Sequence, residues 1–182
     1  MTNLSISTGF VFGAALFLCG LAAVPVKAGP PALQTPAPVI YLADNLDEQD
    51  NLGWCIDTRG RGLSDRLHAH SCKPRGGDVQ FKYVKKTMQI ASATYENLCA
   101  QLLDPPAQGV RLALVKCVAD APAQRFGFNG QKGEFYAAGK RALCLVVGAN
   151  SRSAGPFMPR DLELAPCGST QAKYKTWRIK GG

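Results

Sequence analysis

The chain has 182 residues, of which 46% are hydrophobic and 19% are charged, a composition typical of a folded globular protein rather than a disordered one. Its length suits one well-buried domain. The 21 basic and 13 acidic side chains give a net charge of +8, which favours contact with anionic surfaces but defines no activity. No run of five basic residues is present, so a dedicated nucleic-acid-binding arm is not expected.

Residues 1–28 are predicted to be a cleaved signal peptide. Residues 10–24 are uninterruptedly apolar and are followed by Pro25, and this stretch is short for a membrane-spanning helix. The sequence Val-Lys-Ala at 26–28 then places small or apolar residues where a signal peptidase requires them, although no Lys or Arg precedes the apolar stretch. An uncleaved anchor is the alternative. We expect an exported chain, periplasmic or extracellular, without stable membrane insertion after cleavage.

Cleavage would remove Cys19 and leave an even number of cysteines. The remaining six are Cys55, Cys72, Cys99, Cys117, Cys144 and Cys167. In an exported protein an even set indicates disulfides. The closely spaced C-x2-C pairs typical of zinc sites are missing from the sequence.

Residues 29–50 are predicted to be a Pro-rich linker and an N-terminal lead-in, and residues 51–182 are predicted to be the folded domain. The segment 29–38, "GPPALQTPAP", has the composition of a linker, and no packed structure is expected for it.

The cysteines repeat with a nearly constant period. Cys55, Cys99 and Cys144 are spaced by 44 and 45 residues, and Cys72 and Cys117 are 45 apart. Cys167 follows 50 residues later, and the five additional residues fall in the loop "NSRSAGPFMP" at 150–159. A period that survives one loop insertion indicates three stacked or symmetric units.

Each unit contains short strands with an alternating pattern. The second cysteine of each unit ends a matching heptapeptide, "RLHAHSC", "RLALVKC" or "DLELAPC". The Leu five positions before the cysteine and the Ala or Leu three before it are predicted to face the core, while His68 and His70 face outward. Each unit continues to an aromatic residue, in "DVQF", "AQRF" and "YKTW". The domain is therefore predicted to be all-β, in a threefold barrel-and-cap arrangement.

With these motifs the sequence resembles the ricin B-type β-trefoil lectin family over residues 53–179. The Cys-x-Asp motif of the family is present once, at 55–57. Its Gln-x-Trp motif is present as Gln-Arg-Phe at 124–126, and in weaker form as Lys-Thr-Trp at 175–177 and Val-Gln-Phe at 79–81. The resemblance implies a β-trefoil of three repeats, each closed by a local disulfide. The implied pairs are Cys55–Cys72, Cys99–Cys117 and Cys144–Cys167.

The resemblance also implies a sugar site on the outer face of the first repeat. In the family an Asp accepts hydrogen bonds from sugar hydroxyls and an aromatic ring stacks on the sugar, with two further polar residues beside them. The corresponding residues of this chain are Asp57, His70, His68 and Asp78. The second and third repeats lack an Asp with a stacking ring, so we expect at most one carbohydrate-binding site.

The two histidines admit other interpretations. They are solvated strand residues of no special role, or they form a metal site, because histidines at i and i+2 share one strand face and Asp57 or Asp78 adds an oxygen ligand. We expect neither a bound metal nor a cofactor. Arg59 and Arg61, in the turn "TRGRG", suit phosphate or an anionic glycan, or are simply solvated turn residues.

An enzyme is not expected, because the sequence contains no nucleophile elbow, P-loop or H-E-x-x-H motif. We expect a secreted carbohydrate-binding module whose partners are glycans or glycoconjugates rather than nucleic acid. The alternative is a degenerate trefoil that binds another protein subunit, similar to the cell-binding subunits of bacterial cytolethal distending toxins.

Overall fold

The computed structural model describes residue 1 and residues 29–181, so the predicted signal peptide lies outside the described residues. No helix within this part of the chain is long and apolar enough to span a membrane. The described strands are β1 (Val39–Leu42), β2 (Trp54–Thr58), β3 (Leu67–Ser71), β4 (Phe81–Val84), β5 (Gln89–Ser92), β6 (Leu98–Leu102), β7 (Leu112–Lys116), β8 (Phe126–Asn129), β9 (Glu134–Ala137), β10 (Leu143–Ser151), β11 (Pro159–Pro166) and β12 (Trp177–Lys180). Two short 3-10 helices, η1 (Pro122–Gln124) and η2 (Ala172–Tyr174), precede β8 and β12.

The strands alternate between two kinds of antiparallel pair, and the alternation occurs three times. One kind comprises β12 with β1, β4 with β5, and β8 with β9. The other comprises the hairpins β2–β3, β6–β7 and β10–β11. This threefold arrangement is a β-trefoil, as the family resemblance implied.

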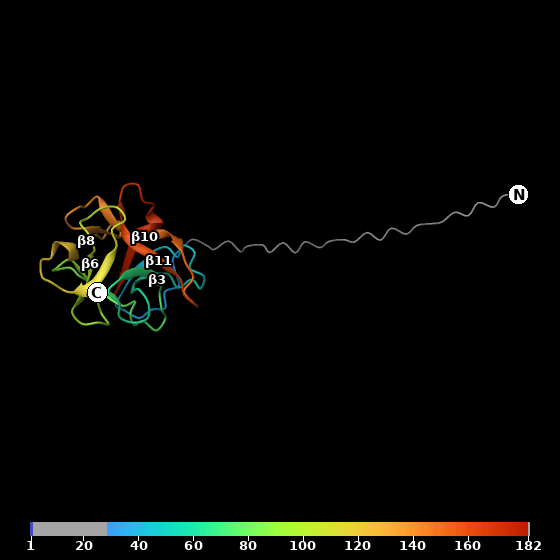
Figure 1. Ribbon diagram of the computed structural model, residues 1–182, viewed down its shortest axis with the longest axis horizontal. Coiled ribbons are helices and arrows are strands. Elements are labelled where there is room, and N and C mark those ends of the chain that lie inside the picture. Colours follow the sequence, from blue (N-terminus) through green and yellow to red (C-terminus); the bar gives the residue numbers. More distant parts are fainter. Residues whose placement is uncertain (2–28, 182) are drawn as a thin grey trace.

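The three hairpins also contact one another. β3 pairs with β11 through Pro159 opposite His70 and Arg160 opposite Ala69. Isolated bridges link the segment before β3 to β7 and the segment before β7 to β11. Figure 1 shows β10, β11 and β3 lying side by side, in the order of the sheet. The third repeat therefore lies directly against the hairpin that carries the predicted sugar site.

The core is built from the positions that the alternating pattern assigned to it. The six heptapeptide residues predicted to face inward are at most 5% exposed and belong to one hydrophobic cluster. Phe81, Phe126 and Trp177, which end the second motif of each repeat, are wholly buried in the same cluster. All nine repeat positions therefore lie in the core, where burial of each large apolar side chain contributes about 1.5–3 kcal/mol.

The three implied disulfides are confirmed. Cys55–Cys72, Cys99–Cys117 and Cys144–Cys167 close segments with sequence separations of 17, 18 and 23 residues. Each joins the two strands of one hairpin, or the residues beside them. Closing a loop of this length contributes about 3 kcal/mol in the chain-entropy description.

The expectation that residues 29–38 lack packed structure is wrong. Thr35 is fully buried and its hydroxyl donates to the Lys73 carbonyl oxygen at 2.9 Å. The next residues continue into β1, which pairs with β12 on one side and with β2 on the other. Within the predicted lead-in, Val39 and Ile40 are completely buried. The Pro-rich segment is therefore packed against the domain, and it leads directly into β1, which lies between β12 and β2 in the sheet.

A buried arginine connects this N-terminal region to the third repeat. The Arg160 guanidinium lies 4.7 Å from the centre of the Trp54 ring, donates to the Gly148 carbonyl oxygen at 2.6 Å, and pairs with the Asp47 carboxylate. Ser151 donates a second hydrogen bond to Asp47 at 2.5 Å. Burial alone would raise the pKa of Asp47, but the hydrogen bonds from Arg160 and Ser151 outweigh it and hold the pKa below its ordinary value of 3.8.

Replacing Asp47 with Asn is expected to destabilise the protein modestly at neutral pH. A carboxylate whose pKa is lowered by folding stabilises the folded state above its unfolded pKa, and the contribution is lost as the pH falls through the folded pKa. The wild type and Asp47→Asn should thus differ in urea midpoint at about pH 7 and converge as the pH falls through the folded pKa of Asp47. Asp50→Asn, at an exposed carboxylate of the same region, is the matched control. If the difference in urea midpoint persists unchanged at acidic pH, it does not come from the ionised Asp47 carboxylate.

Candidate functional site

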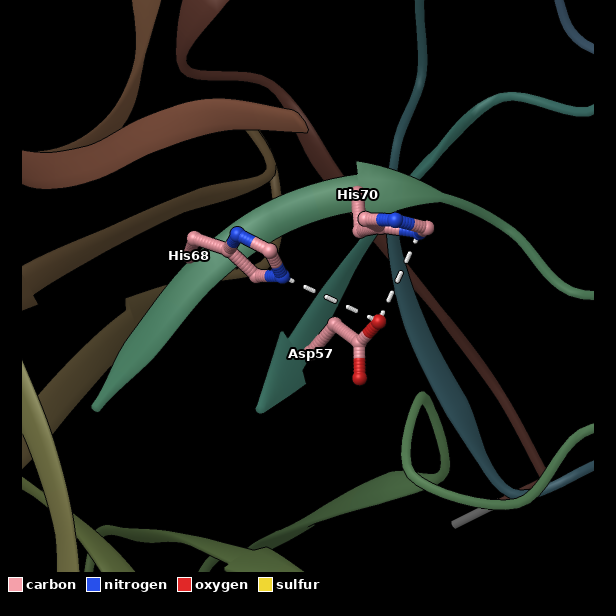
Figure 2. Close-up of side chains that lie close together, drawn as sticks. All are labelled: Asp57, His68 and His70. Atoms are coloured by element: carbon pink, nitrogen blue, oxygen red, sulfur yellow. Dashed lines mark ion pairs between the residues drawn. The ribbon is translucent and has the colours of Figure 1, made fainter. Parts of the chain in front are cut away.

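The predicted sugar-binding residues Asp57, His68 and His70 lie on one face of the β2–β3 hairpin. The pairing register places Asp57 opposite His68, and Cys55 opposite His70. Directly opposed residues and alternate residues of a strand share a face, so all three side chains lie on the face away from the core cluster. Figure 2 shows the two imidazole rings of β3 directed toward the Asp57 carboxylate of β2.

The three side chains are close, but neither imidazole forms a hydrogen bond with the Asp57 carboxylate. Asp57 Oδ2 lies 3.5 Å from His70 Nδ1 and 3.9 Å from His68 Nε2. The two ring centroids are 5.1 Å apart. His70 Nδ1 is also 3.1 Å from the Ser71 carbonyl oxygen, to which it donates when that nitrogen carries the proton.

Lys73 joins the Asp57 carboxylate to the fourth predicted residue, Asp78. Its Nζ lies 2.9 Å from Asp57 Oδ2 and 2.5 Å from Asp78 Oδ1. Burial would lower the pKa of Lys73, but Asp78 and Asp57 outweigh it and raise the pKa, so the ammonium stays charged. Asp78 Oδ2 in turn accepts a hydrogen bond from the Gly62 N–H at 3.2 Å. All four predicted residues therefore belong to one polar cluster.

The histidines face away from the core as predicted, but the interpretation of them as solvated strand residues is wrong. His68 and His70 are 8% and 7% exposed, and Asp57 is completely buried. The loop between β10 and β11, which contains the five-residue insertion, covers His70. Its Phe157 ring lies 5.6 Å from the His70 ring, and Met158 exchanges hydrogen bonds with Ser71 at 2.9 Å each. The third repeat thus covers the outer face of the first.

A cavity of about 510 Å³ remains between this loop and the first repeat. Its volume falls in the range of small-molecule sites. Two of the predicted residues, His70 and Asp78, line it together with Lys73, Phe157 and Arg61. The other two, Asp57 and His68, are not part of its lining.

Lys73 and Phe157 were not among the predicted site residues. Lys73 directly follows the second cysteine of the first repeat, a position to which the family resemblance assigns no role. Phe157 lies in the insertion of the third repeat. The additional length of this loop was the one feature of the sequence that could have indicated a special role for it. Its contact with the first repeat depends on the pairing of β3 with β11, which no local motif specifies.

Three buried polar atoms of the cluster lack hydrogen-bond partners. They are both carboxylate oxygens of Asp57 and His68 Nε2. Lys73 neutralises charge at Asp57 Oδ2, but the geometry of that contact does not make a hydrogen bond. Burial lowers the pKa of His70 below its ordinary value of 6.5, against the opposing effect of Asp57, so that ring is neutral at neutral pH. Native structures leave few buried polar atoms unpaired, which makes this cluster unusual.

Comparison with solved structures supports the fold. A β-trefoil lectin of the Vibrio vulnificus hemolysin/cytolysin, crystallised with N-acetyl-D-lactosamine, is similar with a TM-score of 0.51 and 15% identity, over 79% of this chain and 92% of that one. The cytolethal distending toxin of Actinobacillus actinomycetemcomitans is similar with a TM-score of 0.51 and 14% identity, over 78% and 88%. At these identities the likeness shows the β-trefoil fold alone. No family model and no curated protein sequence matches the chain.

Proposed function

We propose that this chain is an exported carbohydrate-binding module with one sugar site, in the cavity between the first repeat and the β10–β11 loop. The observation that carries the proposal is the composition of the cavity wall. It combines a carboxylate (Asp78), two rings (His70 and Phe157) and two cations (Lys73 and Arg61) within about 510 Å³.

These groups suit the chemistry of a sugar. Vicinal hydroxyls donate to a carboxylate such as Asp78 and accept from Lys73 or Arg61, while the C–H face of a pyranose packs on flat rings. Asp57 has a different role from the one that the family resemblance implies. It is fully buried and contacts Lys73 and the histidines, so it positions these groups instead of touching the sugar.

Two further observations support this proposal. The Vibrio vulnificus trefoil lectin, which has the same fold, was crystallised with N-acetyl-D-lactosamine. Three disulfides in a domain of this size are typical of an oxidising compartment, which supports export.

The test is glycan-array binding by the oxidised protein and its cavity variants. Asp78→Asn and Phe157→Ala are expected to weaken binding by about 10- to 100-fold, because each removes one direct contact of about 1.5–3 kcal/mol. Asp104→Asn, at an exposed carboxylate of the second repeat, should bind like the wild type. Folded, fully oxidised wild-type protein that binds no glycan at any pH would refute the proposal.

A second candidate is a subunit that binds another protein. An apolar cavity of about 560 Å³ on the second repeat favours it, with Leu103, Pro105 and Pro106 in its wall. Leu103 is 39% exposed, so this wall offers an apolar side chain to a partner. The structure of a cytolethal distending toxin shares the trefoil fold. Glycan-negative protein together with a neighbouring gene for a nuclease-like subunit would favour this candidate over the first.

A further inference from the structure

We propose that Asp57, His68 and His70 bind a divalent transition metal ion, and that zinc is the ion they suit. The proposal does not depend on glycan binding, since Asp57 and His68 lie outside the cavity wall. Two imidazoles and one carboxylate are a donor set that zinc uses in proteins, commonly with one position left for water. Thiolate ligands do not compete here, because every cysteine of the described domain is in a disulfide.

The distances are close to those of a metal site. With bonds of about 2.0–2.1 Å, tetrahedral zinc holds two of its N or O ligands about 3.3 Å apart. Asp57 Oδ2 lies 3.5 Å from His70 Nδ1 and 3.9 Å from His68 Nε2. All three donor atoms lie within 4.8 Å of one another, so small side-chain rotations bring them to one ion. Among residues 29–181, this is the one such grouping of His, Cys, Asp and Glu.

The bonding state of these atoms is the second, independent observation. Both Asp57 oxygens and His68 Nε2 are buried without hydrogen bonds. A buried polar atom without a partner costs about 1–3 kcal/mol, and one cation at the point where these atoms converge would satisfy the carboxylate and the imidazole together. Figure 2 shows this convergence, with both rings turned toward the same carboxylate.

The hairpin holds the three ligands in place before any metal arrives. Asp57 and His68 are directly opposed in the β2–β3 ladder, and His70 is two residues along the same strand. The Cys55–Cys72 disulfide ties the two strands together at the other end of the ladder. Ligands on paired strands lose little conformational freedom when the metal binds.

The charge of the cluster also favours a cation. Two carboxylates, Asp57 and Asp78, face a single ammonium, Lys73. Lys73 is the competitor for Asp57 Oδ2, and it retains Asp78, at 2.5 Å, when a metal displaces it. Binding at His70 Nδ1 also replaces the contact of that nitrogen with the Ser71 carbonyl oxygen. Because Lys73 competes with the metal for Asp57 Oδ2, removing its ammonium should strengthen metal binding.

The experiment is isothermal titration of the full oxidised protein, first treated with EDTA, with zinc chloride. We expect one equivalent of zinc and a rise in the thermal unfolding midpoint. His68→Gln should weaken zinc binding by about 100-fold or more, because it removes a direct ligand. Lys73→Met should instead tighten it, an effect that a purely structural Lys73 would not produce. Asp104→Asn, distant in sequence and exposed, should bind like the wild type.

Several outcomes would overturn the metal site. They are no zinc uptake by folded wild-type protein, unchanged uptake by folded His68→Gln, or weaker uptake by folded Lys73→Met. If His68→Gln fails to fold, His70→Gln and the Lys73→Met titration decide the matter. Glycan binding measured with and without EDTA separates this proposal from the preceding one, since zinc uptake without glycan binding would refute only the latter.

Discussion

Replacing Lys73 with Met is expected to lower the free energy of unfolding of the metal-free protein by about 3–5 kcal/mol. The reason is the state in which the substitution leaves Asp57. That carboxylate is completely buried, and its oxygens accept no hydrogen bonds. Lys73, at 2.9 Å, is the cation nearest to it in the described structure. Removing one partner of a buried ion pair leaves an uncompensated charge, which costs far more than the pair itself contributes.

Two further variants test this explanation by urea unfolding in the presence of EDTA. Asp57→Asn combined with Lys73→Met removes both charges and should recover most of the lost stability, whereas Lys73→Met alone should not. Lys132→Met, at an exposed lysine of the second repeat, controls for the general effect of the substitution. If the double variant is no more stable than Lys73→Met, the loss does not come from the unpaired carboxylate.

Replacing Cys55 and Cys72 together with Ala is expected to cost about 3–5 kcal/mol, the upper part of the range for a native disulfide. Two effects add. The loop-closure contribution of about 3 kcal/mol is lost, and so is the packing of two wholly buried sulfurs against Val39 and Val79. The variant thereby loosens both the first hairpin and its contact with β1.

The corresponding change at Cys99 and Cys117 is the comparison that isolates the packing effect. The sequence separations are 17 and 18 residues, so the loop-closure contributions are nearly equal. Cys117, however, is partly exposed. Chemical denaturation of both double variants should show the larger loss at Cys55 and Cys72. Equal losses would mean that burial of the first disulfide adds nothing.

The fold could be predicted because the same sequence pattern occurs three times along the chain. Cysteine spacings of 44 and 45 residues, a Leu two positions from each inward Ala or Leu, and three aromatic ends each specify the same unit. β1 escaped prediction for a physical reason. Its sequence, "VIYL", is short and follows a Pro-rich stretch, and its strand character comes from pairing with β12, far away in the chain.

The sequence predicted which residues lie together in the site, but not which residues cover them. Asp57, His68, His70 and Asp78 do lie together, since a hairpin register can be deduced from one disulfide-closed repeat. The covering of His70 involves Phe157, which approaches from the third repeat. That contact arises from the pairing of β3 with β11, a long-range feature that neither alternation nor spacing encodes. Lys73 escaped for a similar reason, because its two acidic partners become neighbours only after folding.

The insertion in the β10–β11 loop has a consequence for how a duplicated chain diversifies. In a fold of three equivalent copies, each copy is free to drift as long as its own core positions persist. Here the third copy contributes Phe157 and Met158 to the surroundings of His70 and Ser71 in the first. Selection on the proposed site would therefore act on a segment more than 80 residues downstream. Two such proteins with identical first repeats can differ in what they bind, and grafting one repeat between them would not transfer the specificity.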